Sequence, residues 1–371
     1  MLKTAKRIGL IALRGAGAFS VARASSWRRR RLLILCYHGI AIDDEAVWNP
    51  WLYISLATFE RRLEILRRGG YAMLPLTVAL DRLRRDDLPE CAVAMTFDDG
   101  MHDFATRALP VLEQANCPVT VYLATQSVEH GLPVFPLLCS YLLWKGRGRT
   151  IDLSGLGLPG PAVHLSDDNA HNHVLRQLLQ TSITGNLGLP ERHDLATRLA
   201  HRLDIDLEPI LERRLLTVMD RAEVTAVARS GVDFQLHTHR HYSPDNEDEY
   251  RSEIRLNRTS IEALTGRRPT HFCYPSGIHD PAFTPWLEAE GVQSAVTCSS
   301  GYATPSTPLL ELPRLLDHGH LSDIEFEAWT SGAGHWLPSR APAPPIPVQL
   351  GLVNAHASRA AANGASRLPR A

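Results

Sequence analysis

The chain has 371 residues, of which 44% are hydrophobic and 21% are charged, and its formal net charge at pH 7 is -1. This composition is typical of a globular protein with one large α/β domain of roughly 200–250 residues and additional segments. The nearly balanced charge argues against a nucleic-acid partner, so we expect none. The six cysteines form no CxxC pair, which favours buried free thiols over a disulfide or zinc framework and indicates a reducing compartment.

The first 31 residues are basic. No acidic residue occurs up to Ile42, whereas lysines and arginines are frequent and include the run Arg28–Arg31. The apolar stretch Ile8–Leu13 is short for a signal peptide and too short to span a bilayer. We interpret residues 1–31 as a basic N-terminal arm, which either contacts anionic lipid at a membrane surface or is a solvated extension. We therefore favour a cytoplasmic location, or one peripheral to the inner membrane, over export.

The next part of the chain alternates between expected strands and helices. A continuous apolar run over residues 31–37 predicts a buried strand, and an amphipathic helix is expected to begin near Thr58. A second buried strand is expected at 92–97, and a helix then leads to a third strand at 119–123. Because strand, helix and strand follow one another, we expect these strands to be parallel.

The alternation stops between about residues 127 and 225, where the pattern indicates a helical insertion that forms a lid or substrate wall, or that only packs. Strands resume after it. We expect them near residues 232–236, 271–275, 294–298 and 309–316. About seven strands separated by helices predict an α/β fold with a closed or nearly closed barrel. The Pro- and Ala-rich residues 338–371 predict a disordered tail.

Two adjacent carboxylates, Asp98 and Asp99, end the strand at 92–97 and precede Gly100. Repulsion and desolvation push one of two neighbouring buried carboxylates toward its neutral form, unless a positive partner compensates them. A bound cation is the simplest such partner. The pair therefore indicates a candidate metal site at the carboxyl end of a strand, where parallel barrels build their active sites.

Histidines at the end of a later strand complete a possible ligand set. His237 and His241 together with one aspartate give three ligands for a first-row metal and leave positions open for water and substrate. The other aspartate is then free to act as a base. On an extended strand His239 shares a face with His237, so His237 and His239 are an alternative ligand pair.

These residues carry a resemblance to a known family. The segments Thr96–Gly100 and His237-Thr238-x-x-His241 resemble the first two motifs of the polysaccharide deacetylase (NodB-homology, carbohydrate esterase family four) superfamily. Flanking segments agree with it, namely Tyr37-His38, Pro118-x-Thr120, Leu264-Thr265-Gly266 and Phe272-x-Tyr274-Pro275-x-Gly277. The resemblance covers about residues 32–125 and 230–330 and leaves the insertion and both termini unexplained.

The resemblance implies that residues 32–337 form a distorted (β/α) barrel that removes acetyl groups from an N-acetylated glycan. It implies that Asp98 is the general base, that Asp99, His237 and His241 bind a divalent metal, and that a metal-bound water is the nucleophile. Zinc is favoured, and cobalt, nickel, iron or manganese also suit this ligand set.

The family also implies substrate contacts. A backbone N–H near Tyr274 is expected to stabilise the oxyanion, which makes Tyr274 a substrate-binding residue. His38, at the end of the first strand, is expected to be a second one.

The chain also departs from the family pattern. Cys273 stands where many members have an arginine that orients the base, so Arg314 is expected to supply the missing positive charge. The late histidine that acts as general acid in the family has no clean match. We assign that role to His320, with His318 and His38 as alternatives. Because these motifs are weak, a non-catalytic carbohydrate-binding relative, or a hydrolase of another linear or cyclic amide, remains an alternative hypothesis.

Overall fold

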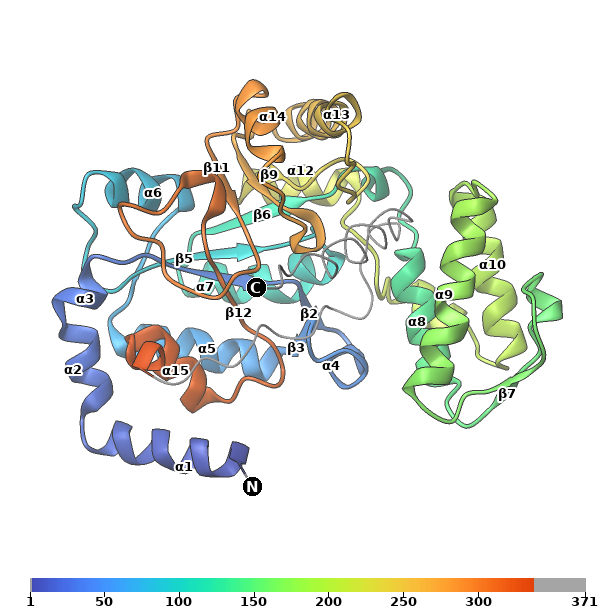
Figure 1. The fold of residues 1–371 in the computed structure, drawn as a ribbon, viewed down its shortest axis with the longest axis horizontal. Helices are drawn as coiled ribbons and strands as arrows, with labels where there is room; N and C mark the ends of the chain where they lie inside the picture. The colour runs from blue at the N-terminus through green and yellow to red at the C-terminus, as the bar shows by residue number, and fades with distance from the viewer. Residues whose placement is uncertain (1, 337–371) are drawn as a thin grey trace, which may run out of the picture. The chain divides into compact units, whose positions relative to one another are not determined.

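The computed structural model describes residues 2–336 (Figure 1). The tail predicted over 338–371 lies outside the described residues. The described chain divides into two compact units, one made of residues 2–134 and 208–336 and the other of residues 135–207. The second unit lies within the range 127–225 expected for the insertion.

The first unit is built on a sheet whose strand order is β11-β10-β9-β6-β5-β1-β12, with β4 paired to β5. All strand pairs of this sheet are parallel. The strands are β1 (Leu33–Tyr37), β4 (Ala72–Met73), β5 (Ala92–Phe97), β6 (Val119–Leu123), β9 (Asp233–Leu236), β10 (His271–Cys273), β11 (Ser294–Val296) and β12 (Leu315–Leu316). The seven strands of the main path curl into a half-barrel, which confirms the predicted fold class.

The edges of this sheet differ from the expectation at one place. Instead of a strand over 309–316, a 3-10 turn spans Leu309–Glu311 and only Leu315–Leu316 forms β12. Pro313 has no N–H to donate to a strand ladder, which shortens the strand. A parallel bridge between Val296 and Leu312 links these residues to β11. This bridge brings the segment before β12 back toward the strands on the other edge of the sheet.

Strands β1 and β5 are buried along their whole length, as continuous apolar runs predict. Helices follow the strands of this unit and lie around the sheet in Figure 1. They are α4 (Glu45–Trp48), α5 (Leu56–Gly69), α6 (Leu76–Arg84), α7 (Leu109–Gln114), α11 (Glu208–Glu212), α12 (Arg221–Arg229), α13 (Glu247–Thr265), α14 (Phe283–Ala289) and α15 (Asp323–Ser331). A small parallel pair, β2 (Gly39–Ala41) and β3 (Tyr53–Ser55), follows β1.

Helix α13 shows how the sequence defines such an element. The Asn246 side chain accepts a hydrogen bond from the backbone N–H of Glu249, which caps the first turn. The helix ends at Gly266, whose φ of 69° is left-handed and favours glycine. The apolar face of the helix is buried, as its periodicity predicts; it includes Tyr250 and Ile254.

The basic N-terminal arm forms helices α1 (Leu2–Gly15), α2 (Ala18–Ala24) and α3 (Ser26–Arg29). It is not the solvated extension that the sequence allowed, because several of its apolar side chains are buried. Leu10, Phe19 and Ala22 of the arm form one cluster with Ile324, Ala328 and Ala333. Arg28 is buried as well, and its guanidinium donates hydrogen bonds to the carbonyls of Thr330, Arg31 and Ala92.

The opposite face of α1 is different. Ile8 is 61% exposed and Ile11 is 54% exposed, so two large apolar side chains lie on the solvent side of this helix. None of the helices within residues 2–336 is both long enough and apolar enough to cross a bilayer.

The second unit is helical, as expected for the insertion. It contains α8 (Phe135–Lys145), a short antiparallel pair β7 (Thr150–Ile151) and β8 (Val163–His164), α9 (Asp168–Thr184) and α10 (Leu189–Arg202). The side chain of Asp167 accepts hydrogen bonds from the N–H groups of Asn169 and Ala170, which fixes the start of α9. A role for this unit as a lid or substrate wall stays a prediction.

Candidate active site

The parallel register places the chemical residues at one edge of the sheet. Tyr37 at the end of β1 pairs with Phe97 at the end of β5, so His38 and Asp98 follow neighbouring strands at the same level. The backbone N–H of Asp98 donates to the carbonyl of Tyr37 over 2.9 Å. His237 follows the end of β9 at the same edge, because the carboxyl ends of parallel strands lie together.

Asp99, His237 and His241 form a buried cluster whose ligand atoms lie within 4.8 Å of one another. The Nε2 atoms of His237 and His241 each lie 3.2 Å from Oδ1 of Asp99. Ligand bonds near 2.0–2.1 Å in a tetrahedral zinc site separate nitrogen and oxygen by about 3.3 Å. The spacing in the structure therefore suits a first-row metal without rearrangement.

The hydrogen bonds around His237 also favour a cation. Its Nδ1 lies 2.9 Å from the carbonyl oxygen of Cys273, and because a carbonyl only accepts, Nδ1 must carry the proton. In a neutral ring the lone pair of Nε2 then faces the carboxylate of Asp99, and two acceptors at this distance need a cation between them. Oδ1 of Asp99 is buried and has no hydrogen-bond partner among the described residues. These residues therefore fit a divalent metal.

Without a metal, a proton can supply the positive charge between the histidines and Asp99, as the directions of the pKa shifts indicate. Burial lowers the pKa of His237, but contact with Asp99, the charges of Asp98 and Asp99 and the carbonyl of Cys273 together outweigh burial and leave this pKa above its ordinary value. Burial lowers the pKa of His241, and Asp99 only partly opposes that shift. One histidine of the pair thus tends to hold a proton between itself and Asp99, and a metal bound there would replace it.

The structure does not bring His237 and His239 together as an alternative pair of metal ligands. Strand β9 ends at Leu236, and Thr238 has a left-handed φ of 59°, so the alternation of an extended strand does not continue. Nδ1 of His239 instead lies 2.9 Å from the hydroxyl of Thr125. His241, whose φ of 54° is also left-handed, turns back to Asp99.

Asn257 on α13 holds the strand ends that carry the histidines, and sequence reasoning missed it. Its Oδ1 accepts the backbone N–H of His237 over 2.9 Å. Its Nδ2 donates to the carbonyl of Leu123 and the hydroxyl of Thr125 over 2.9 and 3.0 Å. Asn257 is fully buried. A lone amide on the apolar face of a predicted helix was the signal that could have identified it.

Arg314 and Asp98 form a buried bidentate ion pair. Nη1 and Nη2 of Arg314 lie 2.7 Å from Oδ1 and Oδ2 of Asp98, respectively. Nε of Arg314 donates to the carbonyl of Thr297 over 3.1 Å, and Nη1 donates to the hydroxyl of Thr96 over 3.2 Å. The expected positive charge therefore lies directly against the expected base, on a segment that follows the first two motifs by a long stretch of chain.

This pair controls the charge of Asp98. Burial alone would raise the pKa of Asp98, but the charge and hydrogen bonds of Arg314 outweigh burial and hold this pKa well below its ordinary value. The thiol of Cys273 lies 3.2 Å from Nη2 of Arg314 and 3.4 Å from Oδ2 of Asp98. A small, neutral residue at position 273 thus accommodates an arginine that arrives from elsewhere in the fold.

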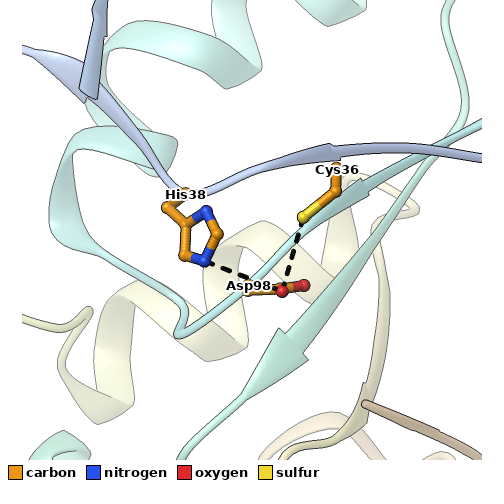
Figure 2. Close-up of side chains that lie close together, drawn as sticks. All are labelled: Cys36, His38 and Asp98. Carbon is orange, nitrogen blue, oxygen red and sulfur yellow. Dashed lines mark hydrogen bonds and ion pairs between the residues drawn. The ribbon is translucent and has the colours of Figure 1, made fainter. Parts of the chain in front are cut away.

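His38 and Cys36 approach Asp98 from the end of β1 (Figure 2). Nε2 of His38 lies 3.8 Å from Oδ2 of Asp98, and the His38 side chain is 12% exposed. The thiol of Cys36 donates toward the same oxygen over 3.5 Å. His38 is thus a histidine outside the Asp99–His237–His241 cluster that the structure places beside the expected base.

His320 and His318 lie in a different environment. The His320 ring is exposed and its centroid lies 5.1 Å from that of Trp51, and the His318 ring lies 4.2 Å from Trp51. Burial, followed by the charge of His320, lowers the pKa of His318 to about 4. Within residues 2–336, no hydrogen bond or ion pair joins either ring to Asp98. The assignment of His320 as general acid stays a prediction that these contacts do not support.

Tyr274 is placed differently from the expectation. Its hydroxyl donates to the carbonyl of Leu310 over 2.9 Å, and its side chain is fully buried. Its backbone N–H donates to the carbonyl of Val296 over 3.3 Å. That N–H is therefore used within the sheet, and an oxyanion donor in this region must come from another group.

Comparisons with known proteins agree with this geometry. The family model described as polysaccharide deacetylase matches residues 85–154 and 191–295. Over these residues the chain is similar to the polysaccharide deacetylase family. The poly-β-1,6-N-acetyl-D-glucosamine N-deacetylase of Escherichia coli (strain K12) is 28% identical over 102 residues, which cover 27% of this chain and 15% of that protein. The chain thus matches only a small part of that relative.

Solved structures show the same fold. The Streptococcus pyogenes deacetylase PplD, in complex with acetate, has a TM-score of 0.54 and 17% sequence identity, and the match covers 81% of this chain and 98% of that one. IcaB from Ammonifex degensii has a TM-score of 0.50 and 17% identity over 82% of this chain and 97% of that one. At this level of identity the likeness supports the fold alone.

The buried pair generates a prediction about stability. We expect Arg314→Gln to lower the free energy of unfolding of the metal-free protein by about 3 kcal/mol at pH 7, because the Asp98 carboxylate stays buried without its partner. In the wild type the pKa of Asp98 is lower than its ordinary value of 3.8. The ionised pair therefore contributes its full stabilisation above pH 3.8, and this stabilisation is lost only as the pH falls below that value. In the variant burial raises this pKa, so the loss grows as the pH rises above about 4.

Urea unfolding at pH 5 and pH 8 measures this difference. Arg61→Gln is the matched control, since Arg61 forms an exposed ion pair with Asp323 over 3.2 Å. We expect the control to lose less than about 0.5 kcal/mol at both pH values. An equal loss at the two pH values for Arg314→Gln would contradict the assignment of the pair.

Proposed function

We propose that the chain is a metal-dependent hydrolase that removes N-acetyl groups from an amino-sugar polysaccharide or oligosaccharide. The observation that carries the proposal is the pair of adjacent buried carboxylates with different partners: Asp99 faces two histidines, and Asp98 faces an arginine. A metal cluster beside a separate ionised carboxylate is what amide hydrolysis by water requires. The family, and the activity named for the E. coli relative, support this substrate class.

The metal would be held by Asp99, His237 and His241, with zinc favoured and cobalt, nickel, iron or manganese also suited to the set. When bound, it supplies Lewis-acid chemistry that polarises the amide carbonyl and makes a water molecule more acidic. His237 is preset for this task, because its Nδ1–H is held by the carbonyl of Cys273 and its Nε2 is directed at Asp99.

Asp98 acts as the base that accepts a proton from the attacking water. Arg314 keeps it ionised at neutral pH and holds both of its oxygens, so its orientation is fixed before substrate binds. Its low pKa makes Asp98 a weak base, so the attacking water must be made more acidic, which is what the metal would supply.

His38 is proposed as the acid that protonates the leaving amine, in place of His320. It lies beside Asp98, with its Nε2 3.8 Å from Oδ2, and is partly open to solvent. A donor at this position reaches the same reaction centre as the base, whereas His320 lies against Trp51. The geometry therefore favours His38 among the three histidines that the sequence left open.

Acetate release from a panel of N-acetylated glycans, including chitooligosaccharides and poly-N-acetylglucosamine fragments, tests the proposal. We expect metal-stripped protein to be inactive and activity to return with zinc or cobalt. Asp99→Asn is expected to lose the metal, whereas Asp98→Asn is expected to retain it and to lose about 10²–10⁴-fold in rate. His239→Gln is the matched control, since His239 contacts Thr125 and lies outside the cluster; it is expected to keep metal and activity.

The outcomes also separate the alternatives. Glycan binding without acetate release by metal-loaded protein would favour the non-catalytic carbohydrate-binding relative. Release of product only from linear or cyclic amides other than N-acetyl sugars would favour the other hydrolase. Full metal content in Asp99→Asn would contradict the ligand set itself.

The choice of acid generates a separate prediction. We expect His38→Gln to lower the rate of acetate release by about 10²-fold or more with the metal content unchanged, because the amine leaves without a proton donor. His320→Gln is expected to change the rate less than threefold, since its ring is exposed and distant from these contacts. A larger loss for His320→Gln than for His38→Gln would restore the original assignment.

We also propose that α1 contacts a membrane surface, which would place the protein peripheral to the inner membrane. The support is the exposed apolar face formed by Ile8 and Ile11 on a helix that contains no acidic residue. Lys6 and Arg14 are already paired with Glu325 and Glu327. We therefore expect apolar insertion to contribute more than attraction to anionic lipid.

Sedimentation with phosphatidylglycerol and phosphatidylcholine vesicles tests this contact. The double variant Ile8→Ser with Ile11→Ser is expected to lower vesicle binding by about tenfold or more, from the lost burial of two large apolar side chains. Val47→Ser, which alters another residue that is 72% exposed, is the control and is expected to bind like the wild type. Equal sedimentation of the double variant and the control would exclude the contact.

A further inference from the structure

We propose that Cys36, His38 and Asp98 form a second metal site, which binds a thiophilic divalent cation such as zinc beside the first cluster. The Sγ of Cys36, a ring nitrogen of His38 and a carboxylate oxygen of Asp98 all lie within 4.8 Å of one another. Figure 2 shows the three side chains converging from the ends of β1 and β5. A thiol, an imidazole and a carboxylate together make a mixed donor set that zinc accepts readily.

The spacing suits coordination. Sγ of Cys36 lies 3.5 Å from Oδ2 of Asp98, and Nε2 of His38 lies 3.8 Å from the same oxygen. A tetrahedral zinc with a Zn–S bond of about 2.3 Å and Zn–O and Zn–N bonds near 2.0 Å separates S from O by about 3.5 Å and N from O by about 3.3 Å. The S–O separation thus matches the tetrahedral value, and the N–O separation exceeds it by about half an ångström.

The site is separate from the first cluster. It uses none of Asp99, His237 and His241, so the two sites share no ligand. A further grouping of Asp98 with His237 and Cys273 also exists, but it shares His237, whose Nε2 already faces Asp99. The grouping with Cys36 is therefore the one that can bind an additional ion.

Two features define how this site behaves. The Arg314 guanidinium is bonded to both oxygens of Asp98 and repels a nearby dication, so the second ion binds more weakly than the first. The site also takes Asp98 and His38, the groups proposed as base and acid. The expected effect on activity rests on that proposed function. Occupancy of the second site blocks turnover, so zinc in excess of one equivalent inhibits the enzyme.

Titration of metal-free protein with cobalt(II), followed by absorption spectroscopy, tests the site without any turnover. The first equivalent binds to nitrogen and oxygen ligands and gives only weak visible bands. The second is expected to add an intense near-ultraviolet band from charge transfer between thiolate sulfur and cobalt. In Cys36→Ser this band is expected to be lost while the first equivalent still binds. Absence of the band from the wild type at several equivalents of cobalt would overturn the proposal.

Two further variants keep the result interpretable. Cys298→Ser is the control for a competing sulfur ligand, because Cys298 is an exposed cysteine whose thiol interacts with Arg314 and Asp98; this variant is expected to retain the band. His38→Gln alters a partly exposed residue whose loss leaves the core intact, and it is expected to weaken the second cobalt at least tenfold. A band that persists in Cys36→Ser, or disappears in Cys298→Ser, would overturn the site.

Zinc inhibition forms the second arm. The ratio of acetate release at one equivalent of zinc to that at ten equivalents is measured within each variant. We expect this ratio to be at least fivefold in the wild type and near one in Cys36→Ser. If no variant releases acetate, the proposed function fails, but the cobalt band still decides whether the second site exists. If acetate is released and neither the band nor inhibition is seen, the second site fails alone.

Discussion

Two neighbouring carboxylates buried at the end of one strand are the constraint on which the rest of this structure depends. Asp98 and Asp99 cannot both stay ionised in a buried site unless each has its own positive partner. The fold solves this by turning them in different directions: Asp99 adopts a left-handed φ of 70° and faces two histidines, and Asp98 faces Arg314. The two carboxylates thereby acquire different partners and different proposed roles.

The surrounding groups make this division rigid. Asn257 joins the ends of β6 and β9, so that the backbone of His237 is held where its ring meets Asp99. The carbonyl of Cys273 fixes the proton on Nδ1 of that ring. On the other side, Arg314 is anchored by the carbonyl of Thr297 before it reaches Asp98. His237 and Arg314 are thus each positioned by at least one contact that does not depend on a ligand.

The groups packed around Asp98 also affect which cations can bind there. An arginine at position 273 would bring its charge from β10, whereas here β10 contributes the neutral Cys273 and the charge comes from the segment before β12. The oxygens of Asp98 are then surrounded by Arg314, two thiols and His38. Such an environment holds the carboxylate ready for a proton, and it also offers sulfur and nitrogen donors to an unwanted cation.

The sequence by itself determined the parallel α/β fold, the insertion of helices and the meeting of Asp98 and Asp99 with histidines at one edge of the sheet, because these depend on local patterns: buried apolar runs, strand–helix alternation and polar residues at strand ends. It also left several choices open that only the tertiary structure decided. Whether His239 or His241 meets Asp99 depends on a left-handed turn at Thr238. Whether Arg314 reaches Asp98 depends on how the sheet curls, which brings together residues far apart in the chain. The sequence alone does not distinguish His38 from His320 as the acid. The pairing of β1 with β5 places His38 beside Asp98. Contacts between distant segments follow from packing, which no local pattern encodes.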